Sequence, residues 1–116
     1  MGTLPTVPEL LEWNCRQYPA TLLNKPEIVQ LTKLLPCWRI AGNSLQRRFG
    51  FSNFHQTMAF VNAVADIAHS ADHHPELQVS YSECVVAYTT HSISGLSLID
   101  FACAAKIDAL SASESP

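Results

Sequence analysis

Residues 71–76, Ala71-Asp72-His73-His74-Pro75-Glu76, separate a helical pattern from an alternating strand pattern and so set the order of elements on both sides. Pro75 lacks a backbone N–H and disfavours the helical conformation of the residue before it, so a helix that reaches His73-His74 must end there. The two imidazoles therefore lie at a helix end. Histidine is suited to exchanging protons near neutral pH, and a third one, His91, follows Thr90.

The residues before this stretch predict a long helix from an N-cap at Asn53 to about Asp72. Apolar residues recur at spacings of three and four, which is typical of a buried helix face. They are Phe54, Met58, Val61, Ala65 and Ala68, widened by Phe60, Val64, Ile67 and Ala71. On the opposite side, polar residues share a narrow sector: His55, Asn62, Asp66, His69 and His73. We therefore expect His69 and His73 to stack one turn apart.

The residues after Pro75 predict two strands. Leu77, Val79 and Tyr81 alternate with polar residues, and a second strand is expected over residues 84–90, with His91 at its end. Further upstream, residues 38–41 and 45–51 flank a Gly-Asn-Ser turn and predict a hairpin.

Two more helices are expected near the ends of the chain. The first begins near Asn24, where Pro26 and Glu27 suit a first helical turn, and ends at Pro36. The last covers residues 98–110, with Ser97 able to cap it and Asp100 able to complete the capping arrangement.

The last helix is apolar nearly all round, so it is either enclosed in the fold or shared between subunits. We favour a shared interface and hence a homo-oligomer. The expected organisation is an N-terminal extension over residues 1–24 that packs loosely or is partly flexible, a domain over residues 25–110, and a polar tail over residues 111–116.

Composition limits the class of protein. The 116 residues are 47% hydrophobic and 15% charged, enough for one domain with a real core. The net charge of −3 provides no basic surplus, so we expect no direct nucleic-acid partner. No apolar run approaches the roughly 18 residues of a membrane span, so we expect no membrane partner. The four cysteines form no C-x-x-C pair and are expected to be reduced, in a cytoplasmic protein small enough to leave nuclear entry open.

Three interpretations of His73, His74 and His91 remain open. They could be structural histidines that hydrogen-bond at the ends of elements. A metal site is suggested by the spacing of His69 and His73, but no glutamate follows His69 as in H-E-x-x-H, and no nearby cysteine or carboxylate completes a ligand set. The third interpretation is metal-free acid–base chemistry, in which one imidazole takes a proton and another delivers one to a leaving group.

These motifs resemble those of the pterin-4a-carbinolamine dehydratases. The matching residues are His69, His73-His74-Pro75, Tyr81, His91 and Asp100, with Trp38, Phe49-x-Phe51-x-x-Phe54 and Gly95-Leu96-Ser97 also in place. The resemblance spans about residues 26–110. It implies an α+β fold with a four-stranded antiparallel sheet and helices packed on one face, assembled into dimers or tetramers.

The activity that the resemblance implies is removal of water from 4a-hydroxy-tetrahydropterin to give quinonoid dihydropterin, in tetrahydrobiopterin recycling, without metal or cofactor. His73, His74 and His91 are the implied catalytic set. The implied substrate-binding residues are Asp72, Thr90, Ser92, Trp38, Asp100 and His69. From the residues alone, Trp38 is more simply a core side chain, and Asp100 either orients an imidazole or only caps its helix.

Two positions depart from the family pattern. Many members carry glutamate in place of His69, and some animal members carry arginine in place of Ile99. A binding role is the alternative function, because some animal members are dimerisation cofactors for a homeodomain transcription factor and plastid relatives help to assemble a carboxylating enzyme. That role would require a protein partner, whereas the complete histidine set favours the enzyme.

Overall fold

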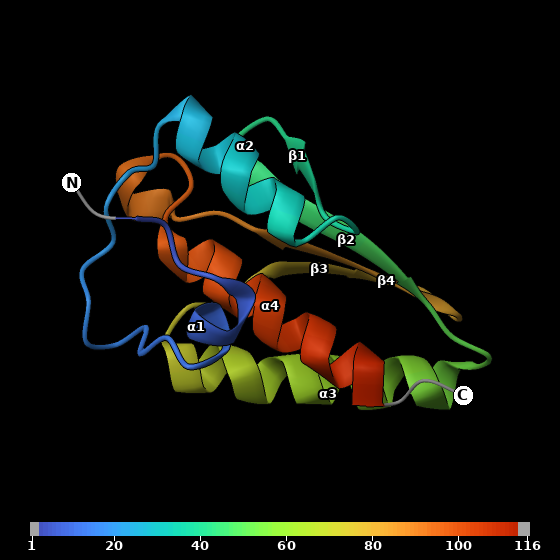
Figure 1. Ribbon diagram of the computed structural model, residues 1–116. Coiled ribbons are helices and arrows are strands. Elements are labelled where there is room, and N and C mark those ends of the chain that lie inside the picture. Colours follow the sequence, from blue (N-terminus) through green and yellow to red (C-terminus); the bar gives the residue numbers. More distant parts are fainter. Residues whose placement is uncertain (1–2, 114–116) are drawn as a thin grey trace.

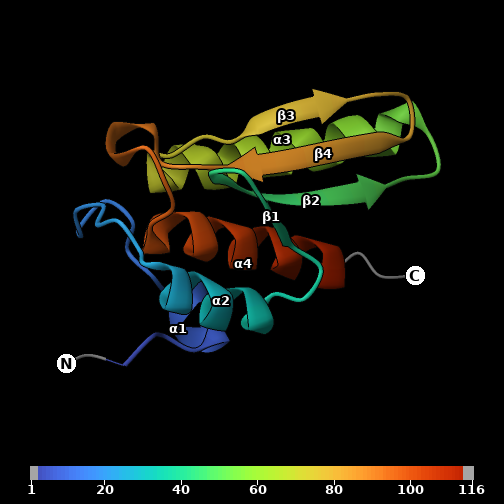
Figure 2. The ribbon, with the colours of Figure 1, turned by 90° about the horizontal axis from the view of Figure 1, so that it is seen from above.

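The sheet consists of four antiparallel strands in the order β1-β2-β4-β3 (Figure 1). They are β1 (Arg39–Ala41), β2 (Ser44–Gly50), β3 (Glu76–Val79) and β4 (Glu83–Tyr88). The computed structural model describes residues 3–113. Helices lie on one face of this sheet (Figure 2), so the expected α+β fold is confirmed.

The alternation of β4 explains why this sheet has a buried face. Cys84, Val86 and Tyr88 are fully buried, while the residues between them are half-buried. In the antiparallel register, Tyr88 pairs with Leu45 and Cys84 pairs with Phe49, both also buried. Since alternate side chains point to opposite faces of a strand, the two central strands form one apolar floor for the helices.

Asparagine caps begin two of the helices whose starts were expected. Asn24 accepts a hydrogen bond from the Glu27 amide, and Glu27 accepts one from the Asn24 amide, so a full capping box starts α2 (Lys25–Leu34). Asn53 likewise accepts from the Gln56 amide at the start of α3 (Phe54–Ala71). The predicted N-cap at Asn53 is confirmed, and the helix expected to begin near Asn24 does begin there.

The buried face of α3 is narrower than the apolar pattern predicted. Phe54 is 48% exposed and Ala65 is exposed, whereas Thr57 is fully buried in line with Phe60 and Val64. The Thr57 hydroxyl lies within hydrogen-bond distance of the carbonyl oxygens of Asn53 (3.0 Å) and Tyr81 (2.9 Å). Burial of this polar group is acceptable because its hydrogen-bonding capacity is satisfied.

α3 ends earlier than the histidine stacking would require. Asp72 is in the left-handed conformation, with φ 53° and ψ 43°, and its amide donates to the carbonyls of Ala68 and His69. The His73 amide donates to the Ala68 carbonyl at 3.0 Å, as in a Schellman-type helix end. The expected stacking of His69 and His73 one turn apart is therefore wrong, because the left-handed residue breaks the helical advance before His73.

α4 (Leu98–Ser113) is enclosed by the chain's own elements. It lies between α2 and α3 (Figures 1 and 2), and a short helix α1 (Val7–Leu11) packs against it. Its fully or nearly fully buried residues are Phe101, Ala102, Cys103, Ala104, Ala105 and Ile107. This corrects the expectation that α4 is a subunit interface, because its apolar sides are already covered within one chain.

The ends of the chain also differ from expectation. In the segment before α2, Leu10 is fully buried and Cys15 is 7% exposed, so the described part of this segment packs on the domain rather than lying loosely beside it. At the other end, residues 111–113 of the expected tail continue α4, and residues 114–116 lie outside the described residues. Within residues 3–113, no helix is both long and apolar enough to cross a bilayer.

Candidate active site

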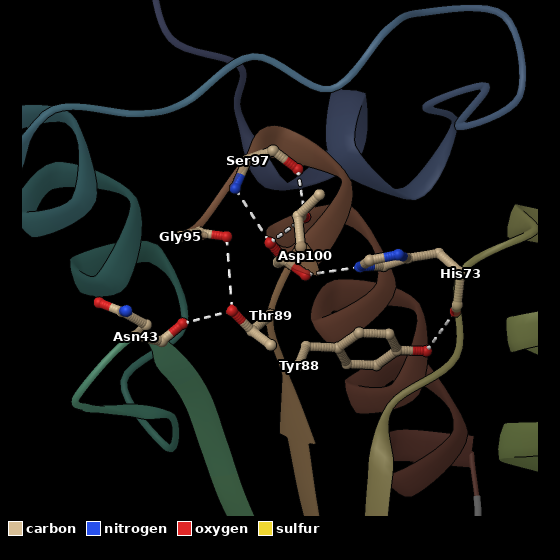
Figure 3. A network of polar contacts seen from close by, with 8 residues as sticks. Asn43, His73, Tyr88, Thr89, Gly95, Ser97 and Asp100 are labelled. Atoms are coloured by element: carbon tan, nitrogen blue, oxygen red, sulfur yellow. Dashed lines mark hydrogen bonds and ion pairs between the residues drawn. The ribbon is translucent and has the colours of Figure 1, made fainter. Parts of the chain in front are cut away.

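A buried carboxylate, Asp100, is the centre of the polar network shown in Figure 3. Its side chain is 0% exposed, and its Oδ1 lies 2.6 Å from His73 Nε2. Its Oδ2 accepts from the Thr90 hydroxyl at 2.7 Å and from the Ser97 amide at 2.9 Å. The sequence left open whether Asp100 orients an imidazole or caps its helix, and the structure shows that it does both.

The contact with Asp100 defines which ring nitrogen of His73 carries the proton. A carboxylate accepts hydrogen bonds, so Nε2 is the nitrogen that donates, and Nδ1 is left for another partner. Charge-assisted bonds of this kind are short and roughly twice as strong as neutral ones. His73 is therefore held in one orientation, with Nε2 directed at Asp100.

Tyr88 supports the same imidazole from the sheet. Its ring stacks on His73 with centroids 5.3 Å apart and an interplanar angle of 25°. Its hydroxyl donates to the His73 carbonyl at 3.3 Å. Burial raises the pKa of the Tyr88 phenol well above its ordinary value, so this hydroxyl remains a donor across the physiological range. The His73 side chain is left only 15% exposed.

The loop after β4 is held by Thr90 and its neighbours. The Thr90 amide donates to the Gly95 carbonyl at 2.9 Å, and its hydroxyl lies 2.9 Å from the Ser97 hydroxyl. The preceding hydroxyl, of Thr89, donates to the Asn43 carbonyl at 2.6 Å. These bonds enclose a single 3₁₀ turn, η1 (His91–Ile93), which begins directly after Thr90.

His74 and His91 follow the two side chains that Asp100 holds. His74 comes directly after His73, and His91 comes directly after Thr90. Both imidazoles are exposed, and within residues 3–113 neither makes a hydrogen bond. The network thus joins both segments to one carboxylate through the side chains of His73 and Thr90, and it leaves the imidazoles of His74 and His91 open to solvent.

The remaining predicted site residues are dispersed. Ser92 is exposed in η1, Asp72 is exposed at the end of α3, and His69 is exposed on the last turn of that helix. Trp38 is 3% exposed, and its indole N–H donates to Asp108 at 2.7 Å. Asp108 lies about 12 Å along α4 from Asp100. The structure therefore places Trp38 in the core, away from His73.

Two residues that contact His73 or Asp100 directly, Tyr88 and Ser97, had not been assigned to the site from the sequence. Tyr88 could have been found, because the alternation of β4 points its ring to the same face as Cys84 and Val86, two residues before Thr90. The amide of Ser97 was expected only as part of a helix start. Among the described residues, no group of three or more His, Cys, Asp or Glu side chains is placed to hold a metal ion.

The fold and the network together define a small α+β protein in which a buried carboxylate fixes a histidine at a helix end. The chain belongs to the pterin 4 alpha carbinolamine dehydratase family, whose sequence profile matches residues 21–110. This result confirms the resemblance that the motifs indicated.

Individual relatives agree with this assignment. A protein of Nitrosospira multiformis, provisionally named a pterin-4-alpha-carbinolamine dehydratase, is 48% identical over 107 residues, covering 90% of this chain and 95% of its own. A protein of Nitrosomonas eutropha with the same provisional name is 54% identical over 89 residues, covering 76% and 79%.

Solved structures share the fold. A structure from Brucella melitensis described as a transcriptional coactivator/pterin dehydratase superposes with a TM-score of 0.75 at 28% identity, covering 78% of this chain and 98% of that one. A pterin dehydratase-like protein identified as a RuBisCO assembly factor in the alpha-carboxysome superposes with a TM-score of 0.53 at 24% identity, covering 63% and 84%. The second similarity concerns the fold alone.

Proposed function

We propose that this protein is a dehydratase that removes water from 4a-hydroxy-tetrahydropterin to give quinonoid dihydropterin, as part of tetrahydrobiopterin recycling. The reaction requires a base that takes a proton from a ring nitrogen and an acid that protonates the hydroxyl group, which leaves as water. The family assignment supports this reaction type.

The observation that carries the proposal is the convergence on Asp100. One carboxylate accepts from His73 and Thr90, and the next residue in each case is an exposed histidine. Both segments are fixed to one group before a substrate binds. His74 and His91 therefore lose less conformational freedom on binding it.

The roles follow from the exposure of each imidazole. His74 and His91 are exposed and have no intramolecular partner among the described residues, so they are free to exchange protons with a bound pterin. His73 is mostly covered and rigid, and its free Nδ1 can accept a proton or a hydrogen bond at the floor of the site. Asp72, Thr90 and Ser92 are close in sequence to these histidines and would border the pterin, whereas His69 lies on the last turn of α3, on a face turned away from His73.

The first test is the decay of enzymatically generated 4a-hydroxy-tetrahydropterin, followed by stopped-flow absorbance in the presence of a metal chelator. We expect the protein to accelerate the decay and the chelator to have no effect. Absence of acceleration would leave the fold without this activity and favour the alternative, a binding module for a protein partner. Loss of acceleration on chelation would contradict the metal-free mechanism.

The second test replaces one exposed histidine. We expect His74→Ala to abolish most turnover, on the order of 100-fold or more, with an unchanged circular dichroism spectrum. His55→Ala is the matched control, because His55 is an exposed histidine on the first turn of α3, at the opposite end of that helix from His74. Wild-type rates in His74→Ala would refute the assigned mechanism.

We also propose that the protein forms a dimer or tetramer. Since α4 is covered within one chain, the contact surface must lie on other elements. Sedimentation equilibrium of the purified protein tests this proposal, and a monomer at micromolar concentration would contradict it.

A further inference from the structure

Arg16 belongs to the segment that precedes the family match, yet its side chain lies against the end of α3. Its Nη2 donates to the His69 carbonyl at 2.8 Å, and its Nε donates to the Ser70 carbonyl at 3.0 Å. Its Nη1 is 3.9 Å from the Asp72 carboxylate. These contacts join residues more than fifty positions apart in the sequence.

The carbonyls that Arg16 binds are those that a helix end leaves open. The last four carbonyls of a helix lack intrahelical partners, and a cation at this end also favours the helix dipole. At the end of α3, the amides of Asp72 and His73 reach Ala68 and His69 but not Ser70. Arg16 therefore supplies the hydrogen-bond donor for the carbonyl of Ser70, which lies three residues before His73.

The backbone around Arg16 is itself fixed to α4. Lys106 Nζ donates to the Trp13 carbonyl at 2.9 Å and lies 3.9 Å from the Cys15 sulfur. Lys106 is on the same helix as Asp100. Residues 13–16 thus connect α4 to the end of α3, and the His73–Asp100 contact connects the same two helices.

We propose that Arg16 is a positioning residue for the His73–Asp100 pair, holding the end of α3 at the place where His73 reaches Asp100. This inference rests on the proposed dehydratase function for its kinetic consequence. Arg16 does not touch the reacting atoms. It acts through the helix end that carries His73 and His74.

The test compares Arg16→Gln and Arg16→Lys with the wild-type full-length protein. We expect Arg16→Gln to lower kcat roughly 10-fold while KM stays within about twofold, because misplacement of a catalytic group reduces the rate more than binding. Arg16→Lys should recover part of the rate, since an ammonium can reach one carbonyl but lacks the fork that reaches both.

A structural readout accompanies the kinetics. Hydrogen exchange of the His73 amide, measured by NMR, should accelerate in Arg16→Gln, because this amide closes the helix end on Ala68. The matched control is Arg48→Gln, which removes another exposed arginine with an ion pair, 2.6 Å from Glu83 on the sheet. That variant should leave both kcat and His73 exchange unchanged.

Two results would overturn the inference. An unchanged kcat in Arg16→Gln would do so, with or without a lower melting temperature, and so would unchanged His73 exchange. If the wild-type protein shows no dehydration at all, the proposed function fails instead, and the exchange measurement alone decides whether Arg16 holds the end of α3.

Discussion

Asp100 is a single buried side chain that joins several parts of the site. Its two oxygens accept from a histidine, a hydroxyl and a backbone amide that come from three different segments. A buried carboxylate is costly unless its oxygens are satisfied, and here all of its contacts are with groups of the site. The pairing of Asp100 with Ser97 was visible in the sequence as a capping pattern. That Asp100 orients an imidazole was left open, and spacing along the chain could not show that the imidazole is that of His73, because it does not reveal which helix ends meet.

Replacement of this carboxylate tests both of its tasks. In Asp100→Asn, an amide N–H₂ must face either His73 or the pair formed by Thr90 and Ser97, and both sides present donors. We expect a loss of about 1–3 kcal/mol in the free energy of unfolding, measured by urea denaturation, together with a large fall in kcat. Equal stability and turnover in the variant would show that the network is dispensable.

Cys15 should ionise at an unusually low pH for a thiol. The hydrogen bond from Cys103, aided by the positive charge of Lys106, lowers the pKa of Cys15 to about 6. Between that value and the ordinary thiol pKa of about 8.5, the unfolded chain binds more protons than the folded one. Stability should therefore rise with pH across this interval and fall as pH drops through about 6.

The measurement is urea unfolding at several pH values, compared between the wild type and Cys15→Ser. In Cys15→Ser, we expect the free energy of unfolding to lose the part of its pH dependence that comes from ionisation of the Cys15 thiol. The ultraviolet absorbance of the thiolate should disappear in the same variant. A thiolate signal that appears only at about pH 8.5 would contradict the lowered pKa.

At the level of elements, the conformation of the chain at the end of α3 determines the positions of His73 and His74. Pro75 correctly indicated that no helix could continue past His74, and the helix ends at Ala71. The left-handed conformation of Asp72 had no clear signal, because glycine is the usual residue there and aspartate only tolerates it. One residue of this kind was enough to turn His73 away from the face that carries His69.

Substitution of Asp72 tests this helix end. An L-residue in the left-handed region carries a cost of roughly 1–2 kcal/mol, which is smaller for aspartate and absent for glycine. Asp72→Gly should therefore be at least as stable as the wild type, and Asp72→Ala should be less stable than Asp72→Gly by about 1 kcal/mol. Chemical denaturation measures both. If Asp72→Ala were more stable than Asp72→Gly, the left-handed conformation of residue 72 would not limit stability.

At the level of the whole molecule, the helices and strands could be predicted from the sequence, but the elements that pack against each of them could not. The hairpin of β1 and β2, the strands β3 and β4, and the helices α2, α3 and α4 follow from alternation, apolar stripes and capping residues. The expected role of α4 was wrong because a helix apolar on all sides fits both an enclosed position and an interface, and only the placement of α1 and α2 distinguishes them. α1 itself was missed, since its capping box spans only Thr6 to Glu9 among nearby prolines.

The enclosure of α4 predicts sharp differences between neighbouring alanines. Ala104 is fully buried, and Ala104→Leu should lower the free energy of unfolding by about 1–3 kcal/mol, because added methylenes have no space. Ala109→Leu is the matched control, because Ala109 is exposed on the same helix, and its effect should stay within about 0.5 kcal/mol. Similar effects in both variants would mean that α4 is not packed from all sides.

The sharing of Asp100 between a helix start and a histidine also has a consequence for directed evolution. Where a cap and a functional group are separate residues, a library can improve thermal resistance at one position and keep turnover at another. Here position 100 admits no such trade, because one carboxylate accepts hydrogen bonds both from the helix start and from the histidine. Selection for heat tolerance in this chain should therefore retain aspartate at position 100 even when no pterin is ever supplied.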